Sequence, residues 1–385
     1  MYNIKINTFF YVKKNKCIII MDKDYYKKQI ITYMGNKRKV LRDIQDIIDI
    51  LNLDKSITIG EGFSGSGIVS RLLKENCSKL YVNDMAGYSK TLNDCYLANP
   101  TPLMKKKIKQ YIEKANKFAD NPTNDVPKYI QKYWSPQSKN IKKGERVYFT
   151  YENGKRIDAY RYFIEKLPEK YKPFLLGPLL VQCSIHTNTS GHFAAFYKEN
   201  DVGKYGGKTG TDIKRITQKI TLEMPLFSEK KAKVYSDRLD VNDWVKKIPK
   251  VDVMYYDPPY NKHPYAIFYF LLDIINDWDI KKEIPDTYRG QPKNWKLSSY
   301  NSKKHAEKVF EELIKNTKAK KILISYNNTG IIPPNKMENM LKKYGYLIKF
   351  PIEHKTYNKM KGIANYKRKE EKKKIKEMIY LLDLS

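Results

Sequence analysis

One stretch near the N-terminus constrains the fold more than any other part of this 385-residue chain. A short apolar segment, Ser56 to Gly60, runs into the glycine-rich turn EGFSGSG (61–67), and a helical pattern covers Ile68 to Asn76. A second apolar segment, Lys79 to Asn83, ends at the acid Asp84. Strand, glycine turn, helix, strand and acid in this order are typical of a βαβ unit, whose two strands pair in parallel. The sequence therefore predicts an α/β fold.

The alternation of strands and helices stops near residue 99 and resumes near residue 233. Between them prolines and lysines cluster, helices are predicted at Thr101 to Phe118 and Pro173 to Ile185, and DVGKYGGKTG (201–210) predicts a mobile loop. Inserts of this kind sit on loops at one edge of a domain and often read the substrate. The predicted division is an N-terminal extension over 1–20, an α/β domain made of 21–99 and 233–385, and a mainly helical insert over 100–232.

Apolar periodicity predicts the remaining elements of the α/β domain. Further helices are expected at Lys39 to Asn52, Ala266 to Trp278, Ser302 to Asn316 and Lys336 to Tyr344. In VYSDRLDVNDWV (234–245) a strand followed by a helix is expected. Further strands are expected in VDVMYY (251–256), and at Lys321 to Tyr326, Tyr346 to His354 and Lys374 to Leu382.

The formal charge of +32 indicates a polyanion as partner, because basic proteins of this size usually meet nucleic acid. Genome composition is an alternative source of the charge, since Lys, Asn, Ile and Tyr all have A/T-rich codons. No apolar run approaches the roughly 18 residues that span a bilayer, so a cytoplasmic protein is expected. Four scattered cysteines without a CxxC pair argue against zinc and against a disulfide framework, and no metal is expected.

The tetrapeptide Asp257-Pro258-Pro259-Tyr260 ends an apolar run that is predicted to be a strand. Two prolines fix two φ angles and remove two N–H donors, which leaves the preceding carbonyls free. Asp257 and the carbonyl of Pro258 can then accept both hydrogens of a planar exocyclic amino group, while Tyr260 stacks on the ring that carries it. The alternative is a rigid loop at the end of a strand.

Two other motifs indicate a ligand with a positive amino group and a carboxylate. Glycines in EGFSGSG let the backbone approach a ligand, but Glu61 would repel a phosphate, and neither a dinucleotide fingerprint nor a P-loop fits. Asp84 stands where nucleoside-binding α/β folds hold ribose hydroxyls. In YMGNKRKV (33–40), Lys37 is a candidate partner for a ligand carboxylate. The alternatives are a tight βα turn for 61–67, an N-cap for Asp84 and a capped turn with a solvated basic face for 33–40.

Taken together, YMGNK, EGFSGSG and YYDPPY resemble the site-specific DNA adenine-N6 methyltransferases. Within that family, the chain resembles the Dam-like class, in which the cofactor motifs come first, then a target-recognition insert, then DPPY. Gly62 stands where that family often has a proline. The stretches TSGHFAAFYKE (189–199), ISYNNTG (324–330) and HKTYNKMKG (354–362) also look like the family.

The resemblance implies a Rossmann-like methyltransferase fold and S-adenosylmethionine as cofactor. By this resemblance, Tyr33, Gly35 and Lys37 contact the methionine end of the cofactor, and Glu61 lies near its amino group. Phe63 and the backbone of Ser64, Gly65, Ser66 and Gly67 lie against the cofactor. Asp84 binds the ribose, and Asp240 faces the cofactor adenine, with Asp237 as a less favoured substitute. The target adenine is assigned to Asp257, Pro258, Pro259 and Tyr260.

The implied activity is methylation of adenine in a specific double-stranded DNA sequence, with the base flipped into the DPPY pocket. The implied setting is a restriction-modification system with a cognate endonuclease, or a phage or orphan modification enzyme. An N4-cytosine methyltransferase, whose motif usually begins with Ser, and a non-catalytic DNA-binding protein are the alternatives.

DNA contacts are expected mainly in the insert, where Arg, Asn and Gln can address base edges. The candidates there are Arg146, Arg156, Arg161 and TNTSGHF (187–193), with a phosphate contact or an ordinary surface position as the favoured alternative for each. The basic tract YKRKEEKKK (366–374) is expected to be a solvated hairpin loop near DNA. Tyr265, Phe268, Tyr269 and Phe270 are expected to pack a helix or line the rim that faces DNA.

Overall fold

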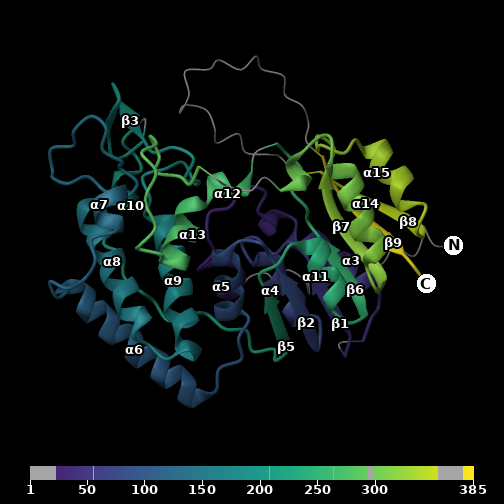
Figure 1. The fold of residues 1–385 in the computed structure, drawn as a ribbon. Helices are drawn as coiled ribbons and strands as arrows, with labels where there is room; N and C mark the ends of the chain where they lie inside the picture. Colours follow the sequence, from purple (N-terminus) through teal and green to yellow (C-terminus); the bar gives the residue numbers. More distant parts are fainter. Residues whose placement is uncertain (1–22, 55, 208, 263, 294–297, 354–375) are drawn as a thin grey trace.

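The structure of the protein is a computed structural model that describes residues 23–54, 56–207, 209–262, 264–293, 298–353 and 376–385. A lobe built on a sheet and a lobe built of helices lie side by side, with α5, α12 and α13 between them (Figure 1). The predicted N-terminal extension and the basic tract 366–374 lie outside the described residues. In the part of the chain that is described, every helix is too short or too polar to cross a membrane.

Seven strands form one sheet within the described residues, in the order β5-β2-β1-β6-β7-β9-β8. The pairs from β5 to β7 are all parallel, and β9 runs antiparallel to both β7 and β8. A mostly parallel sheet of this kind confirms the predicted Rossmann-like α/β fold. The strands are β1 (Thr58–Glu61), β2 (Lys79–Asn83), β5 (Lys233–Asp237), β6 (Val251–Tyr256), β7 (Ala319–Asn327), β8 (Tyr346–Glu353) and β9 (Lys376–Asp383).

Helices cover both faces of this sheet, as parallel strands require. Along β6, Val253 and Tyr255 point to one face and Met254 and Tyr256 to the other, which is the period of two that a strand imposes. The helices α3 (Leu41–Ile50) and α4 (Ile68–Glu75) pack on the first face. The second face is covered by α11 (Val241–Lys247), α14 (Ala306–Asn316) and α15 (Pro334–Leu341). Shorter elements of this lobe are α2 (Asp24–Lys27), η1 (Lys37–Lys39) and η3 (Ser299–Asn301).

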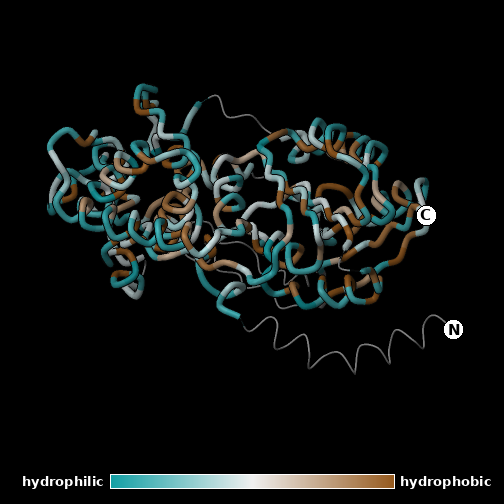
Figure 2. The backbone as a smooth tube through the Cα atoms, turned by 90° about the horizontal axis from the view of Figure 1, so that it is seen from below, coloured by the Kyte–Doolittle hydropathy of each residue, from teal (hydrophilic) through white to brown (hydrophobic). Residues whose placement is uncertain are grey.

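The helical lobe has a third apolar core of its own, and hydrophobic segments run through the interior of both lobes (Figure 2). This core extends beyond the predicted insert, because it also contains Leu92 of α5 and Leu271 and Leu272 of α13. The insert boundaries at 100 and 232 therefore stay a prediction. The elements around this core are α5 (Gly87–Tyr96), α6 (Pro102–Asp120), α7 (Ile130–Trp134), α8 (Tyr151–Glu165), η2 (Glu169–Tyr171), α9 (Lys172–Ile185), α10 (Ile213–Thr217), α12 (Tyr265–Phe268) and α13 (Phe270–Asp277).

Two local predictions differ from the structure. The single helix expected over 266–278 is broken into α12 and α13, because Tyr269 takes a non-helical backbone conformation with φ −124° and ψ 16°. The segment 201–210 contributes β4 (Val202–Gly203), which forms a small hairpin with β3 (Lys198–Glu199), so it is not entirely a loop.

Candidate active site

A cavity of about 290 Å³ opens where β1, β2 and β6 end. Ligands of open α/β sheets bind at this carboxyl edge, so the topology alone marks it as the candidate site. Predicted site residues that line the cavity are Tyr33, Gly35, Lys37, Glu61, Phe63, Ser64, Gly65, Ser66, Asp84, Asp240, Asp257 and Pro259. The other three are not among the lining residues but adjoin residues that are: Gly67 follows Ser66, Pro258 lies between Asp257 and Pro259, and the Tyr260 hydroxyl lies against Gly35.

The glycine-rich turn owes its shape to two residues with positive φ, Gly65 at +51° and Gly67 at +74°. A Cβ at Gly65 would lie 2.8 Å from the Tyr33 ring, so only glycine fits there. Asp84 accepts the Gly65 N–H at 2.7 Å and the Ala86 N–H at 2.9 Å. The acid thus ties the turn to the end of β2, and the alternative that Asp84 caps α5 is wrong, because Ala86 occupies that position.

Glu61 is the most isolated charge of the cavity. Its side chain is buried, and neither carboxylate oxygen accepts a hydrogen bond from the residues that the structure describes. Burial raises the pKa of Glu61 to about 8, which the nearby Ser70 hydroxyl offsets only in part. A buried carboxylate without a partner favours a ligand that brings a positive charge.

Asp240 and Asp237 lie differently, although both are near the end of β5. Asp240 lines the cavity and caps α11 by accepting the Asn242 N–H at 2.9 Å. Asp237 is not among the lining residues and accepts the Trp244 Nε1–H at 3.1 Å. The geometry therefore favours Asp240 as the residue that a ligand can reach.

Asp257, the first residue of the DPPY motif, forms an ion pair with Lys37 across 3.0 Å. Burial raises the pKa of Asp257 to about 7, and Lys37 opposes this rise. Burial alone would lower the pKa of Lys37, but Asp257 and Glu377 outweigh it and hold that pKa well above its ordinary value. Lys37 thus contacts two carboxylates of the protein itself, and its predicted contact with a cofactor carboxylate stays a prediction.

Glu377 of β9 is a charged residue beside the site that the sequence analysis missed. It lies 2.7 Å from the Lys37 ammonium, and its side chain is 6% exposed. The signal was present in KEMIYLL, where a single acid starts an otherwise apolar strand. A buried acid at the beginning of a strand requires a partner, and none of the sequence motifs identifies that partner.

Tyr265 and Tyr269 hold the segment that carries Tyr33 and Gly35. The Tyr33 ring stacks on Tyr269 at 4.6 Å and on Tyr265 at 5.2 Å between centroids. Tyr269 accepts the Met34 N–H at 2.7 Å, and Tyr265 donates to the Met34 carbonyl at 3.2 Å. Of the aromatic residues after DPPY, Tyr265 lines the cavity and Tyr269 is buried, as are Phe268 and Phe270.

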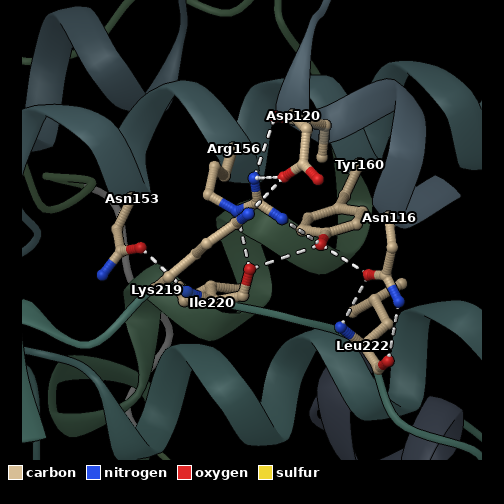
Figure 3. A network of polar contacts seen from close by, with 9 residues as sticks. Asn116, Asp120, Asn153, Arg156, Tyr160, Lys219, Ile220 and Leu222 are labelled. Atoms are coloured by element: carbon tan, nitrogen blue, oxygen red, sulfur yellow. Dashed lines mark hydrogen bonds and ion pairs between the residues drawn. The ribbon is translucent and has the colours of Figure 1, made fainter.

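The three arginines expected to read bases are engaged in internal contacts instead. Arg156 donates to the carbonyls of Ile220 and Ala119, to Asp120 and to Tyr160, and is buried (Figure 3). Arg161 is buried beside Glu165. Arg146 donates to the carbonyls of Pro285, Thr287 and Tyr133. Most of their donors have partners inside the protein, and the Arg161 Nε that has none among the described residues is buried, so DNA contact by these arginines is not supported.

The TNTSGHF segment divides into a buried and an accessible half. Thr187, Asn188 and Thr189 are buried, whereas Ser190 to His192 are partly exposed. The His192 ring packs edge-on against Phe268 of α12 at 4.9 Å. The accessible half therefore lies beside the helix that follows the DPPY loop, and its contact with DNA stays a prediction.

The structure combines a Rossmann-like sheet with a glycine turn after β1, acids after β2 and β5, and DPPY after β6. Together these features define an amino-group methyltransferase. The chain belongs to the D12 class N6 adenine-specific DNA methyltransferases, whose family model matches residues 33–340.

Curated relatives agree with this family. The chain is 29% identical to the Type II methyltransferase M.NlaIII of Neisseria lactamica, over 83% of this chain and 89% of the relative. It is 27% identical to the Type II methyltransferase M.CviAII of Paramecium bursaria Chlorella virus 1, over 85% of this chain and 92% of the relative. It is 28% identical to the Modification methylase StsI of Streptococcus sanguinis, over 81% of this chain but only 46% of that longer protein.

The protein is thus a DNA adenine methyltransferase that uses S-adenosylmethionine. The cavity fits this cofactor, because the partnerless carboxylate of Glu61 suits its positive amino group and the bare backbone at Gly65 permits close approach. Among the described residues, no group of three His, Cys, Asp or Glu side chains is placed to hold a metal ion.

Proposed function

We propose that the DPPY pocket receives a target adenine flipped out of double-stranded DNA, beside a cofactor held by the glycine turn. The observation that carries this proposal is that one cavity joins Glu61, Asp84 and Asp240 to Asp257 and Pro259. Cofactor and target base then meet without a large rearrangement. Placing two reactants in line is itself a major source of catalysis.

The cofactor-binding roles are those that the family resemblance implies, and the lining of the cavity supports them. Glu61 binds the amino group, Asp84 the ribose and Asp240 the cofactor adenine, while Phe63 and the 64–67 backbone lie along the ligand. Tyr33, Gly35 and Lys37 close the methionine end. When bound, S-adenosylmethionine supplies a methyl group on a positively charged sulfur, which is a good leaving group.

In the target-base pocket, the protein orients and polarises the adenine. Asp257 and the Pro258 carbonyl accept hydrogen bonds from the N6 amino group, which directs its lone pair toward the methyl group. The ionised carboxylate of Asp257 also favours the positive charge that develops on the nitrogen. Tyr260 stacks on the base and recovers part of the few kcal/mol that flipping costs.

A Tyr260→Ala variant tests the stacking role. Base–aromatic stacking contributes about 1–3 kcal/mol per base, so we expect kcat/KM for DNA to fall by about 10- to 100-fold. Tyr260→Phe keeps the ring and should stay within about threefold of the wild type. Tyr346→Ala is the control, because Tyr346 is 74% exposed on β8. Equal activity of Tyr260→Ala and wild type would remove Tyr260 from the base pocket.

The pH dependence of the reaction tests the state of Asp257, whose pKa burial raises to about 7. Below that pH the carboxyl is protonated and loses an acceptor, so kcat/KM for DNA at saturating cofactor should fall about tenfold per pH unit. The charged and titratable groups that face Asp257 are Lys37, Glu377, Glu61, Tyr255, Tyr260 and Tyr265. A rate that stays constant to pH 5 in folded protein would show that the ionised form is not needed.

Base flipping itself is testable with 2-aminopurine in place of the target adenine. The fluorescence of this base rises when it leaves the stack, so we expect an increase on binding to the wild type with a cofactor analogue. No increase in a complex that binds the same duplex would show that the base stays stacked.

We also propose that the protein modifies one specific sequence and acts in the cytoplasm, where a cognate restriction endonuclease would meet the same DNA. The names of the relatives support this, since they are Type II methyltransferases and modification methylases. Deleting the gene in a host that carries the endonuclease should cause cleavage of the host DNA. Survival of the deletion strain with unmodified sites would argue for an orphan enzyme.

A further inference from the structure

We propose that Glu377 is a positioning residue for methyl transfer, which holds the Lys37 ammonium against Asp257 at the mouth of the base pocket. This inference rests on the proposed role of Asp257. Glu377 lies beyond residues 33–340, which are the residues that the family model matches.

The contacts form a continuous chain from the C-terminal strand to the DPPY motif. Ser325 donates its hydroxyl to Glu377 Oε1 at 2.8 Å, and the Lys37 ammonium lies 2.7 Å from the same oxygen. The other side of that ammonium is 3.0 Å from Asp257 Oδ1. Lys37 is therefore held between two carboxylates, one of which faces the cavity.

The direction of β9 explains how a residue so late in the chain reaches the site. The parallel strands bring their carboxyl ends to the cavity, but β9 is antiparallel and brings its beginning. Glu377 is the second residue of β9 and pairs with Asn327, the last residue of β7. β9 therefore places Glu377 at the edge of the sheet where DPPY begins.

A purely structural role explains this cluster poorly. The side chains of Lys37 and Glu377 are 5% and 6% exposed, and burying charges is costly even when they are paired. Apolar residues at these positions would stabilise the fold at least as well as the ion pair does. When both acids are ionised, Asp257, Glu377 and Lys37 together carry a net negative charge, which suits a reaction whose reacting nitrogen becomes positive.

Without Glu377, Lys37 loses one of its two anchors, and its flexible stem no longer has one preferred direction. The distance to Asp257 would then vary, and with it the orientation of the carboxylate that receives the adenine amino group. The acids proposed to bind the cofactor lie elsewhere, Glu61 at the end of β1, Asp84 after β2 and Asp240 after β5, and would be unaffected.

A double-mutant cycle in single-turnover methyl transfer tests this proposal. At saturating S-adenosylmethionine, Glu377→Gln should slow transfer by about 10- to 100-fold, the range expected for a hydrogen bond to a charged group. In a Lys37→Met background the same change should cause no further loss, and it should restore some activity, because it removes repulsion between two buried carboxylates. Glu338→Gln, which breaks an exposed ion pair with Lys349 in the same lobe, is the control that keeps full activity.

Equal losses from Glu377→Gln in both backgrounds would overturn the proposal, since a merely structural residue costs the same with or without Lys37. If Glu377→Gln does not fold, Ser325→Ala replaces it, with a loss of about threefold to tenfold that again should vanish in the Lys37→Met background. Asp257→Ala in the same assay separates the two proposals. An active Asp257→Ala would overturn the proposed function, whereas an inactive one with additive losses at Glu377 and Lys37 would overturn only the role of Glu377.

Discussion

Replacing Asp257 with alanine should lower the rate of methyl transfer by at least about 100- to 1000-fold, the usual effect of removing one preorganised electrostatic partner. The carboxylate lines the cavity at the start of DPPY and is proposed to accept the adenine amino hydrogens. Cofactor affinity should change little, because Glu61, Asp84 and Asp240 remain. Rapid-quench assays with labelled cofactor measure the rate, and calorimetry measures the affinity.

The matched control is Asp252→Ala, in β6, the strand that Asp257 directly follows. Asp252 does not line the cavity. It accepts the Thr58 N–H at 2.8 Å and forms an ion pair with Lys320. This control should keep the wild-type rate. Full activity of Asp257→Ala, or an equal loss in both variants, would remove Asp257 from the chemistry.

Replacing Arg156 with methionine should destabilise the helical lobe by about 3 kcal/mol, because several buried acceptors lose their donor together. Arg156 joins α8 to the end of α6 and to the segment around Ile220 (Figure 3). Methionine keeps much of the apolar stem but donates no hydrogen bond. Chemical denaturation followed by circular dichroism measures the change in the free energy of unfolding.

Lys219→Met is the control for this prediction. Lys219 pairs with the same Asp120 carboxylate, but its side chain is 57% exposed, so its loss should cost less than about 1 kcal/mol. If Arg156→Met kept full stability but altered the methylated sequence, Arg156 would be a base reader after all.

The sheet and the cofactor motifs were predictable because they depend on short, local patterns. Apolar runs followed by glycines or acids marked β1, β2 and β6 within one or two residues, and the motif residues meet in one cavity. These signals mark where the strands end, and the parallel topology brings those ends to one edge of the sheet.

What the sequence could not show depends on tertiary contacts. The break at Tyr269 arises where its hydroxyl meets Met34, more than two hundred residues earlier. Arg156 looked available for DNA because nothing local reveals that Ala119 and Ile220 present carbonyls to it. Glu377 was missed for the same reason, since its partner Lys37 lies at the opposite end of the chain.

The measurement that tests the central claim most directly is nucleoside mass spectrometry, with modified-base sequencing, of DNA from a host that expresses the protein. Wild type should yield N6-methyladenine confined to one sequence, and Asp257→Ala should yield none. N4-methylcytosine in place of N6-methyladenine, or unchanged adenine methylation in the Asp257→Ala strain, would contradict the account.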